Sequence, residues 1–189
     1  MTALAAAAPS VQLFAWYRIH DLPPGATVIG DENDLAFGVL DTAGAPKPAR
    51  DALAHVVRLF GRPIRSLATR VATRPAGQPV EVHAFERSDA VVVILAWLPT
   101  PPLSPPAPEP PEPDRRTVRA TVALPFVLRC APSLHDAAGN KRPPPDWDEA
   151  AVHLDLEGAS PAVVAIAAAC RGPEKAITKT REGENTKIE

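Results

Sequence analysis

Residues 80–98, VEVHAFERSDAVVVILAWL, decide the fold class, because their pattern predicts two β-strands joined by a short turn. From Val80 to Phe85, small apolar residues alternate with polar or larger ones, as in a strand with one face buried. Ser88-Asp89 marks the turn, and the run from Ala90 to Leu98 is apolar on both faces. A strand without a polar face is expected at the centre of a sheet.

The segments around this stretch add further short strands with the same period of two. They are expected at residues 66–73, 118–124, 126–128, 152–157 and 162–169. Pro125 interrupts one run, where an edge position or a bulge is expected. Residues 133–145 are polar and predict a loop. Many short strands with turn signals between them predict a mainly-β fold, an antiparallel β-sandwich of Ig-like or jelly-roll-like type, over residues 63–171.

The segment before these strands has the period of a helix. Pro48 can occupy the first turn of a helix, and Gly61 can end it. The apolar residues in between repeat at helical spacing and predict one apolar face, made of Ala49, Leu53, Val56, Val57 and Phe60. Upstream, residues 11–19 are almost continuously apolar, as in a strand that is covered on both faces. Residues 11–62 therefore predict one βα unit.

Three segments predict no packed structure. Residues 1–10 are expected to be a disordered N-terminus, and residues 172–189 a disordered, charged tail. Residues 99–114 hold much of the proline excess and predict an extended loop between strands. The first residues lack the charged region of a signal peptide, and no run reaches the ~18 apolar residues of a membrane span. The sequence thus predicts no membrane interaction and leaves the compartment open.

Composition narrows the expected partners and cofactors. The formal net charge is −2 and the pI about 6.2, without a concentrated basic patch, so no nucleic acid is expected as a partner. The two cysteines, Cys130 and Cys170, match no zinc-ligand spacing. Each ends an apolar run, which favours small buried thiols, while a disulfide between two strand ends stays open. No metal site and no cofactor is predicted.

The common catalytic motifs are missing from the sequence: a Gly-rich phosphate loop, H-E-x-x-H, C-x-x-C and G-x-S-x-G. The histidines are scattered, and surface roles are expected for His55, His83 and His153. Carboxylates that could serve sugar chemistry are interpreted as solvated turn or loop charges: Asp31, Glu32, Asp34, Glu109 and Glu112. We therefore predict no catalytic residue in this chain.

Trp16 and Tyr17, on the first expected strand, leave two interpretations open. Aromatic rings stack well on the apolar faces of sugars, and aromatic residues at strand ends often line pockets. The commoner role of such side chains is to fill a core.

Two stretches resemble the end of a (β/α)8-barrel glycoside hydrolase of clan A, similar to family 39. They are Phe14–Asp21, FAWYRIHD, and Phe37–Ala49, FGVLDTAGAPKPA. In such enzymes an aromatic pair ends the eighth strand, and a stretch of the form G-L-L-D-x-x-G-x-P-K-P-A leads into the eighth helix. The following strands are similar to the β-sandwich that accompanies the barrel in several of these families.

The resemblance implies an incomplete enzyme. A (β/α)8 barrel needs about 250 residues, and this chain offers one βα unit. The catalytic glutamates of such enzymes lie on earlier strands, so none is carried over. Trp16 alone matches a site position, the aromatic floor of the sugar-binding subsite, and Asp21 receives no role. The resemblance implies a C-terminal, non-catalytic part whose sandwich accompanies a barrel from elsewhere, with carbohydrate bound through that barrel. The alternatives are a stand-alone carbohydrate-binding module and a protein-interaction module.

Overall fold

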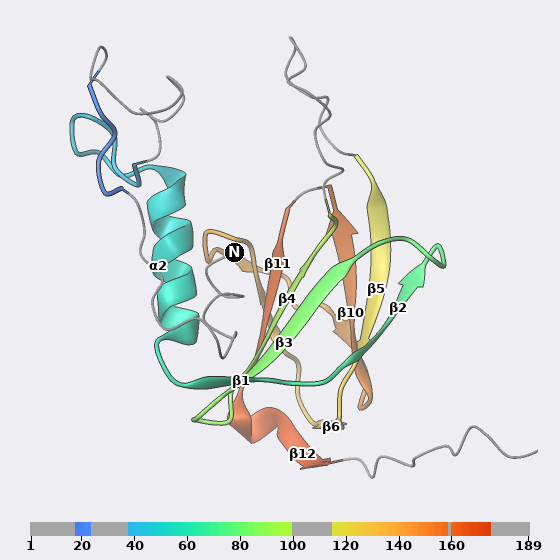
Figure 1. Ribbon diagram of the computed structural model, residues 1–189. Helices are drawn as coiled ribbons and strands as arrows, with labels where there is room; N and C mark the ends of the chain where they lie inside the picture. The colour runs from blue at the N-terminus through green and yellow to red at the C-terminus, as the bar shows by residue number, and fades with distance from the viewer. Residues whose placement is uncertain (1–17, 24–37, 100–114, 159, 175–189) are drawn as a thin grey trace, which may run out of the picture.

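The computed structural model describes residues 18–23, 38–99, 115–158 and 160–174. This part of the chain is mainly β, with antiparallel sheets and the helix α2 (Pro48–Phe60) beside them (Figure 1). The mainly-β, sandwich-like fold expected from the sequence is confirmed. The strand expected over residues 11–19 lies outside the described residues except for its last two positions, so the βα unit of a barrel stays a prediction.

The larger sheet has six strands. In spatial order they are β1 (Ile64–Ser66), β3 (Glu81–Arg87), β4 (Val92–Trp97), β11 (Ala162–Ile166), β7 (Ser133–His135) and β8 (Lys141–Arg142). Strand β4 comes from the run that is apolar on both faces, and it lies between β3 and β11. The predicted central strand is therefore confirmed. The turn from β3 to β4 closes by a hydrogen bond from the Arg87 N–H to the Val91 carbonyl, 2.9 Å long.

The second sheet has four strands and faces the first. They are β2 (Arg70–Arg74), β5 (Thr117–Ala123), β10 (Ala151–Glu157) and β9 (Asp146–Trp147). Two further strands, β6 (Phe126–Leu128) and β12 (Arg171–Glu174), form a separate antiparallel pair. A short 3-10 helix, η2 (Ala168–Cys170), directly precedes β12.

The structure corrects three sequence predictions. The strand expected over residues 66–73 is two strands, because the chain crosses from the larger sheet to the smaller one between β1 and β2. The loop expected over residues 133–145 contains β7 and β8, since the Asp136 carboxylate closes a tight turn by accepting hydrogen bonds from the backbone N–H and the side-chain amide of Asn140. The tail expected from residue 172 begins inside β12.

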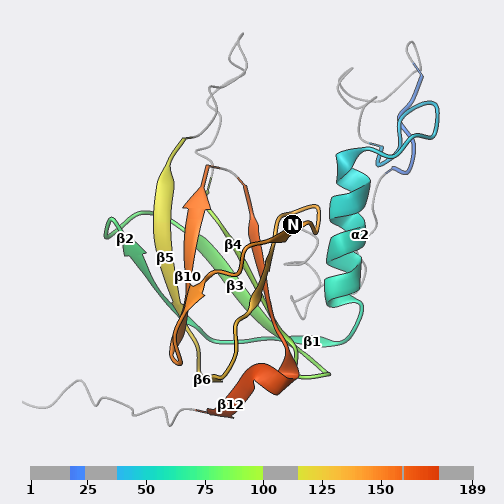
Figure 2. The same ribbon diagram turned by 180° about the vertical axis from the view of Figure 1, so that it is seen from behind.

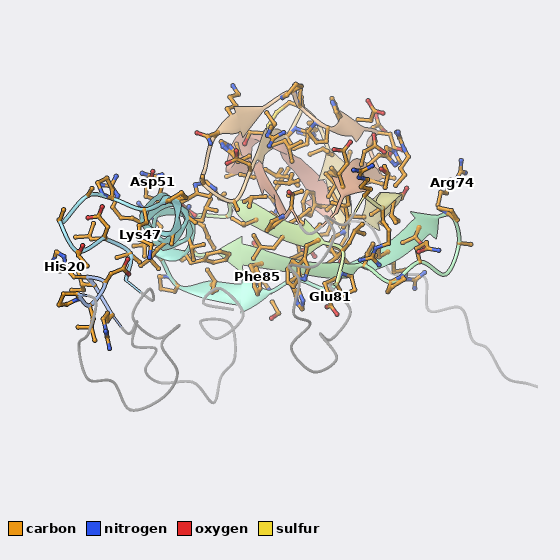
Figure 3. The ribbon with its side chains drawn as sticks, turned by 90° about the horizontal axis from the view of Figure 1, so that it is seen from above. His20, Lys47, Asp51, Arg74, Glu81 and Phe85 are labelled. Atoms are coloured by element: carbon orange, nitrogen blue, oxygen red, sulfur yellow. A yellow bond between two sulfur atoms is a disulfide. The ribbon has the colours of Figure 1, made fainter. Side chains whose placement is uncertain are left out.

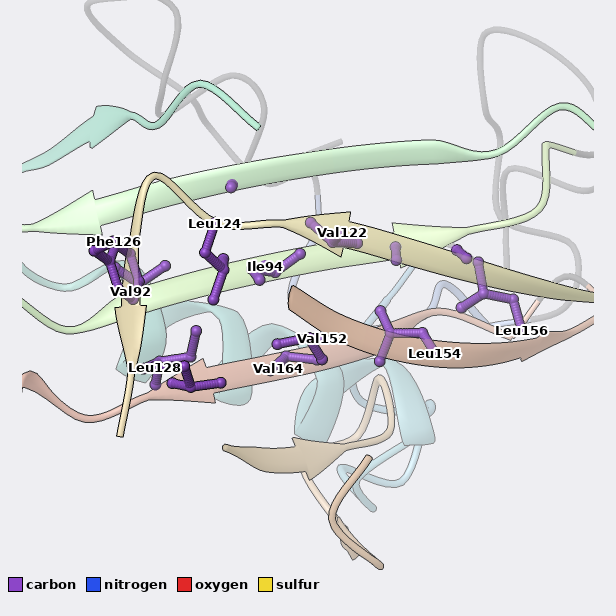
Figure 4. Close-up of a cluster of buried hydrophobic side chains, with 14 of the residues drawn as sticks. Val92, Ile94, Val122, Leu124, Phe126, Leu128, Val152, Leu154, Leu156 and Val164 are labelled. Atoms are coloured by element: carbon purple, nitrogen blue, oxygen red, sulfur yellow. The ribbon is translucent and has the colours of Figure 1, made fainter. Parts of the chain in front are cut away.

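An apolar core fills the space between the two sheets (Figure 4). Its fully buried side chains come from both sheets and include Val92, Ile94, Val122, Val152, Leu154 and Val164. Phe126 and Leu128 of β6 close one end of this core and are 0% and 1% exposed. Burial of apolar side chains is the main favourable term in folding, so this core holds the sandwich together.

Helix α2 covers the outer face of the larger sheet (Figures 2 and 3). Phe60 meets Phe85 edge-on, with ring centroids 5.3 Å apart and planes at 87°. The Arg87 side chain donates a 3.2 Å hydrogen bond to the carbonyl of Leu59, near the end of the helix. This cover explains why Phe85 and Val93, which point away from the core, are only 2% and 0% exposed.

The two cysteines are joined in a disulfide, Cys130–Cys170, with Cα atoms 5.1 Å apart. The favoured expectation of two buried thiols is therefore wrong. Only Cys170 is buried, while Cys130 lies at the surface just after β6. The bond fastens η2 to the end of β6. Nearby, the Arg171 guanidinium lies 4.6 Å from the centre of the Phe126 ring and 2.6 Å from a carboxylate oxygen of Glu86.

Candidate functional site

Asp21 is the centre of a polar cluster that we call the Asp21 clasp, made of Asp21, Gly38 and Lys47. One carboxylate oxygen of Asp21 accepts the Gly38 N–H at 2.8 Å, and both oxygens lie 2.9–3.0 Å from the Lys47 ammonium. Lys47 hydrogen-bonds this carboxyl and so lowers its pKa, assisted by the Gly38 N–H. The Asp21 and Lys47 side chains are only 15% and 28% exposed.

The backbone explains why glycine stands at position 38. The Asp21 N–H donates to the Leu40 carbonyl and the Leu40 N–H donates to the Ile19 carbonyl, both at 2.9 Å, so these two short segments run parallel. A Cβ atom at position 38 would overlap the backbone of His20 and Asp21. Only glycine allows so close an approach.

The other residues of the 37–49 motif, from Asp41 to Lys47, form a turn that leads into α2. One carboxylate oxygen of Asp41 accepts the backbone N–H groups of Ala43 and Ala45, at 2.9 and 2.7 Å. Gly44 adopts φ = +84°, which glycine reaches without strain. The Lys47 N–H then donates to the Val39 carbonyl at 3.0 Å and places the lysine at the start of α2. These motif residues thus build a fixed entry into the helix.

A second cluster joins α2 to the larger sheet. We call it the helix seat: His55 of α2, His135 of β7, and Gly139 of the turn after β7. The two imidazole rings have centroids 5.5 Å apart and planes tilted by 38°. His55 is 6% exposed, so the predicted surface role of this histidine is wrong. Gly139, with φ = +90°, packs so closely that a Cβ atom there would lie 2.6 Å from the His55 Nδ1.

The apolar side chains of α2 are divided between two faces. The residues turned toward the sheet surround His55 and are half-buried: Ala52, Val56, Leu59 and Phe60. Ala49, Leu53 and Val57 follow one another at a spacing of four and form what we call the open face of α2, in which Ala49 and Val57 are exposed and Leu53 is half-buried. Val57 is 57% exposed, and Ile19, in the segment paired with Leu40, is 65% exposed. The predicted apolar face is therefore covered only in part.

A third cluster, on the outer face of the smaller sheet, has the linear order of an acid–base relay. The His153 Nδ1 lies 3.1 Å from the Thr121 hydroxyl and its Nε2 lies 3.3 Å from an Asp148 carboxylate oxygen. Asp148 also accepts the N–H groups of Ala150 and Ala151, which lower its pKa together with His153. These contacts fasten β10 to its neighbours. None of these three side chains lines the hollow between the β7–β8 turn and β10.

A hollow of about 470 Å³ lies between the β7–β8 turn and β10. Polar residues on its walls include His135, Asp136, Arg142, Asp155 and Glu157. Asp136 lies 3.8 Å from Arg142, and Asp155 lies 3.4 Å from Arg119, so two of these carboxylates are already in ion pairs. The hollow therefore has a mixed polar and apolar lining, with two of its three carboxylates already paired.

Several predicted site residues cannot be placed. Trp16 and Tyr17 lie outside the described residues, as do Asp31, Glu32, Asp34, Glu109 and Glu112. His83 and His153, expected at the surface, have side chains that are 34% and 24% exposed. The described ranges contain no group of three His, Cys, Asp or Glu side chains that could hold a metal ion. They also contain no helix long and apolar enough to cross a membrane.

The helix seat has no signal in the sequence, because a single histidine among apolar residues adds no periodic pattern. The Asp21 clasp could have been found, since the Gly38…Lys47 stretch already stood out.

In comparisons with known proteins, no protein-family model and no curated protein matches the chain. Its function is therefore inferred from its residues.

Proposed function

We propose that this chain is the C-terminal, non-catalytic part of a glycoside-hydrolase-like protein, and that its sandwich braces a catalytic barrel that hydrolyses glycosidic bonds. One observation carries the proposal: α2 is apolar on two adjacent faces, and on the second of them Ala49 and Val57 stay exposed. A helix that is apolar over so wide an arc is usually buried by more than one partner. The open face is where a barrel would pack.

The Asp21 clasp supports the same proposal. Its two short segments, around His20 and Leu40, pair in parallel. Parallel pairs occur mainly in α/β folds whose sheets are covered on both faces, yet Ile19 is largely exposed in this chain. A neighbouring βα unit would cover Ile19 and the open face together. In the full barrel, Trp16 would floor the sugar-binding subsite by stacking on the substrate.

The carboxyl groups support a non-catalytic role. Glycoside hydrolysis needs a carboxylic acid that stays protonated, and so has a raised pKa, opposite a second carboxylate. Every described carboxyl group with a shifted pKa is shifted downward by hydrogen bonds that favour its charged form: Asp21, Glu86, Asp89, Asp136 and Asp148. None of these five suits the role of the general acid.

The test joins this chain to the coding sequence found upstream of Met1. The extended protein and the 189-residue chain are purified in parallel and assayed with a panel of aryl glycosides. The proposal predicts hydrolysis by the extended protein and none by the chain alone. Turnover by the chain alone that persists through purification would contradict it, and so would an upstream sequence without barrel strands.

A second function, direct binding of a polysaccharide by the sandwich, is favoured by Trp147, which is 37% exposed on the edge strand β9. An exposed indole can stack on a sugar ring. Affinity electrophoresis in polysaccharide gels would test this with Trp147→Ala. Retardation of the wild type that the substitution removes would favour the binding module. Equal migration of both proteins in every gel would leave the bracing function as the better explanation.

A further inference from the structure

The helix seat buries an imidazole that lacks a full set of hydrogen bonds. His55 is 6% exposed, and its Nε2 has no hydrogen-bond partner among the described residues. Gly139 packs against the opposite side of the ring, near Nδ1. A neutral imidazole tolerates this site, because one of its nitrogens carries only a lone pair. A protonated imidazole carries a charge and two N–H donors, and burying such a group without an acceptor is costly.

The charged and titratable groups around His55 do not compensate that cost. From β7, His135 faces the ring, and its own nitrogens lie 3.2–3.3 Å from the Ser133 hydroxyl and the Gly139 carbonyl. From α2 itself, Arg58 adds a positive charge. Asp136 is the one carboxylate that favours the charged imidazole. Its oxygens are already bound by Asn140, with Arg142 at 3.8 Å.

We propose that the helix seat is a pH-sensitive latch: protonation of His55 releases α2 from the larger sheet while the sandwich stays folded. The latch is a property of this chain and does not depend on the proposed function. If a barrel does precede α2, the same latch would loosen its attachment to the sandwich in acid.

The direction of the pH dependence follows from the two states of the helix. Burial, then His135 and Arg58, lower the pKa of His55 below its ordinary value of 6.5 in the docked state. In the released state the ring is solvated and titrates near its ordinary value, so the released state binds more protons. The ratio of docked to released helix therefore falls as the pH drops below about 6.5, by at most about tenfold per pH unit. Above pH 6.5, His55 is neutral in both the docked and the released state, so the ratio of the two states does not change with pH.

The Asp21 clasp separates this latch from general acid unfolding. The pKa of Asp21 is lowered from 3.8, so the clasp is intact near pH 6.5, where the ratio of docked to released helix begins to fall. The stability that the Asp21–Lys47 ion pair contributes is fully present above pH 3.8. It is lost only as the pH falls through the lowered pKa of Asp21. A change that begins near pH 6.5 thus reports on the helix seat.

Hydrogen exchange tests the latch in the full chain. Protection factors, which remove the intrinsic pH dependence of exchange, are measured between about pH 7.5 and pH 5, on either side of the ordinary histidine pKa. The latch predicts that protection over Pro48–Phe60 falls on acidification while β4, β5 and β10 keep theirs. His55→Leu, which cannot be protonated, should keep its helix protection at both pH values. His153→Gln, on the outer face of the smaller sheet, is the matched control and should lose helix protection as the wild type does.

An NMR titration of the imidazole signals gives a second measurement that holds even if His55→Leu fails to dock. His55 should titrate below 6.5 in the wild type. In His135→Gln, which removes the facing imidazole, the pKa of His55 should rise and the acid loss of protection should shrink. A His55 that titrates at or above 6.5, or helix protection that does not change with pH, would overturn the latch.

Discussion

The space between the two sheets and the contact beneath α2 are held together in different ways. Between the sheets, aliphatic side chains from both layers are completely buried, and a disulfide fastens one end. Beneath α2, a histidine is the most buried helical residue, supported by one edge-on pair of phenylalanines and one hydrogen bond from Arg87. The first region is one continuous apolar cluster built from both sheets. The second is a small contact that one proton can disturb.

Under the proposed function, α2 and the Asp21 clasp are the part of the molecule that packs against a partner. Helix α2 and the segments of the Asp21 clasp are fixed in shape by the turn at Asp41 and by the Lys47 ion pair. On the open face, the described residues nevertheless leave Ala49 and Val57 exposed. Ordered local structure together with an exposed apolar face is typical of a region that packs against something else.

The largest expected effect comes from breaking the core. Phe126→Ala removes a ring that is 0% exposed and also the partner of the Arg171 guanidinium. We expect the free energy of unfolding in urea to fall by about 3–5 kcal/mol. Phe60→Ala is the matched control, because the Phe60 ring lies between α2 and the larger sheet. This substitution should lower the hydrogen-exchange protection of the helix and leave the strands protected. Equal global losses from both substitutions would mean that the two regions unfold together.

The next effect comes from the disulfide. Cys130 and Cys170 are 40 positions apart in the sequence, and removing such a bond costs roughly 2–4 kcal/mol. We expect reduced wild type and the double substitution Cys130→Ala/Cys170→Ala to unfold at lower urea concentrations than the oxidised protein. Protection of α2 should respond only through this global change, since the bond lies away from the helix seat. An unchanged midpoint after complete reduction would show that the bond adds nothing to the core.

A smaller, local effect is expected at the Asp21 clasp. Asp21→Asn keeps an acceptor for the Gly38 N–H but removes the charge that binds Lys47. Amides between residues 38 and 47 should exchange several-fold faster, while β4 and β5 stay unchanged. In the wild type the same loss should appear only in strong acid, because the pKa of Asp21 is lowered. Faster exchange throughout the sandwich would show that the clasp supports more than its own segment.

The smallest effect on the chain itself is expected at the open face. Val57→Lys changes a side chain that is 57% exposed and puts a good helix former into the last turns of α2. The free energy of unfolding of the 189-residue chain should stay within about 0.5 kcal/mol of the wild type. In the upstream-extended protein, the same lysine would be buried against the barrel and should reduce both stability and hydrolysis. Equal behaviour of both extended proteins would remove the open face as a docking surface.

Much of the sandwich could be predicted from the sequence because it depends on local alternation. The central strand β4 lies where the period of two predicted it. The same is true of the consecutive strands β5 and β6, which are separated at Pro125. The division of residues 66–73 between two sheets could not be predicted, since the pattern of one segment does not say which sheet it joins. The small hairpin of β7 and β8 depends on side-chain hydrogen bonds of Asp136, which leave no hydrophobic period.

Of the two clusters beside α2, the Asp21 clasp was partly predictable from the sequence and the helix seat was not. The stretch from Gly38 to Lys47 stood out through its glycines, prolines and charges, and it forms the Asp21 clasp and the entry to α2. The partner of Lys47 lies 26 positions earlier in the chain, so spacing alone could not identify it. The helix seat joins residues about 80 positions apart, His55 and His135, and only the folded chain brings them together.

Hydrogen exchange of the wild-type chain at neutral pH tests most directly whether α2 is held more weakly than the sandwich. We predict that amides of α2 open with a much smaller free energy than those of β4, β5 and β10, so that the helix is released before the sheets unfold. If the helix and these strands exchanged with the same free energy, α2 would be an integral part of the core, and its open face would have no need of a partner.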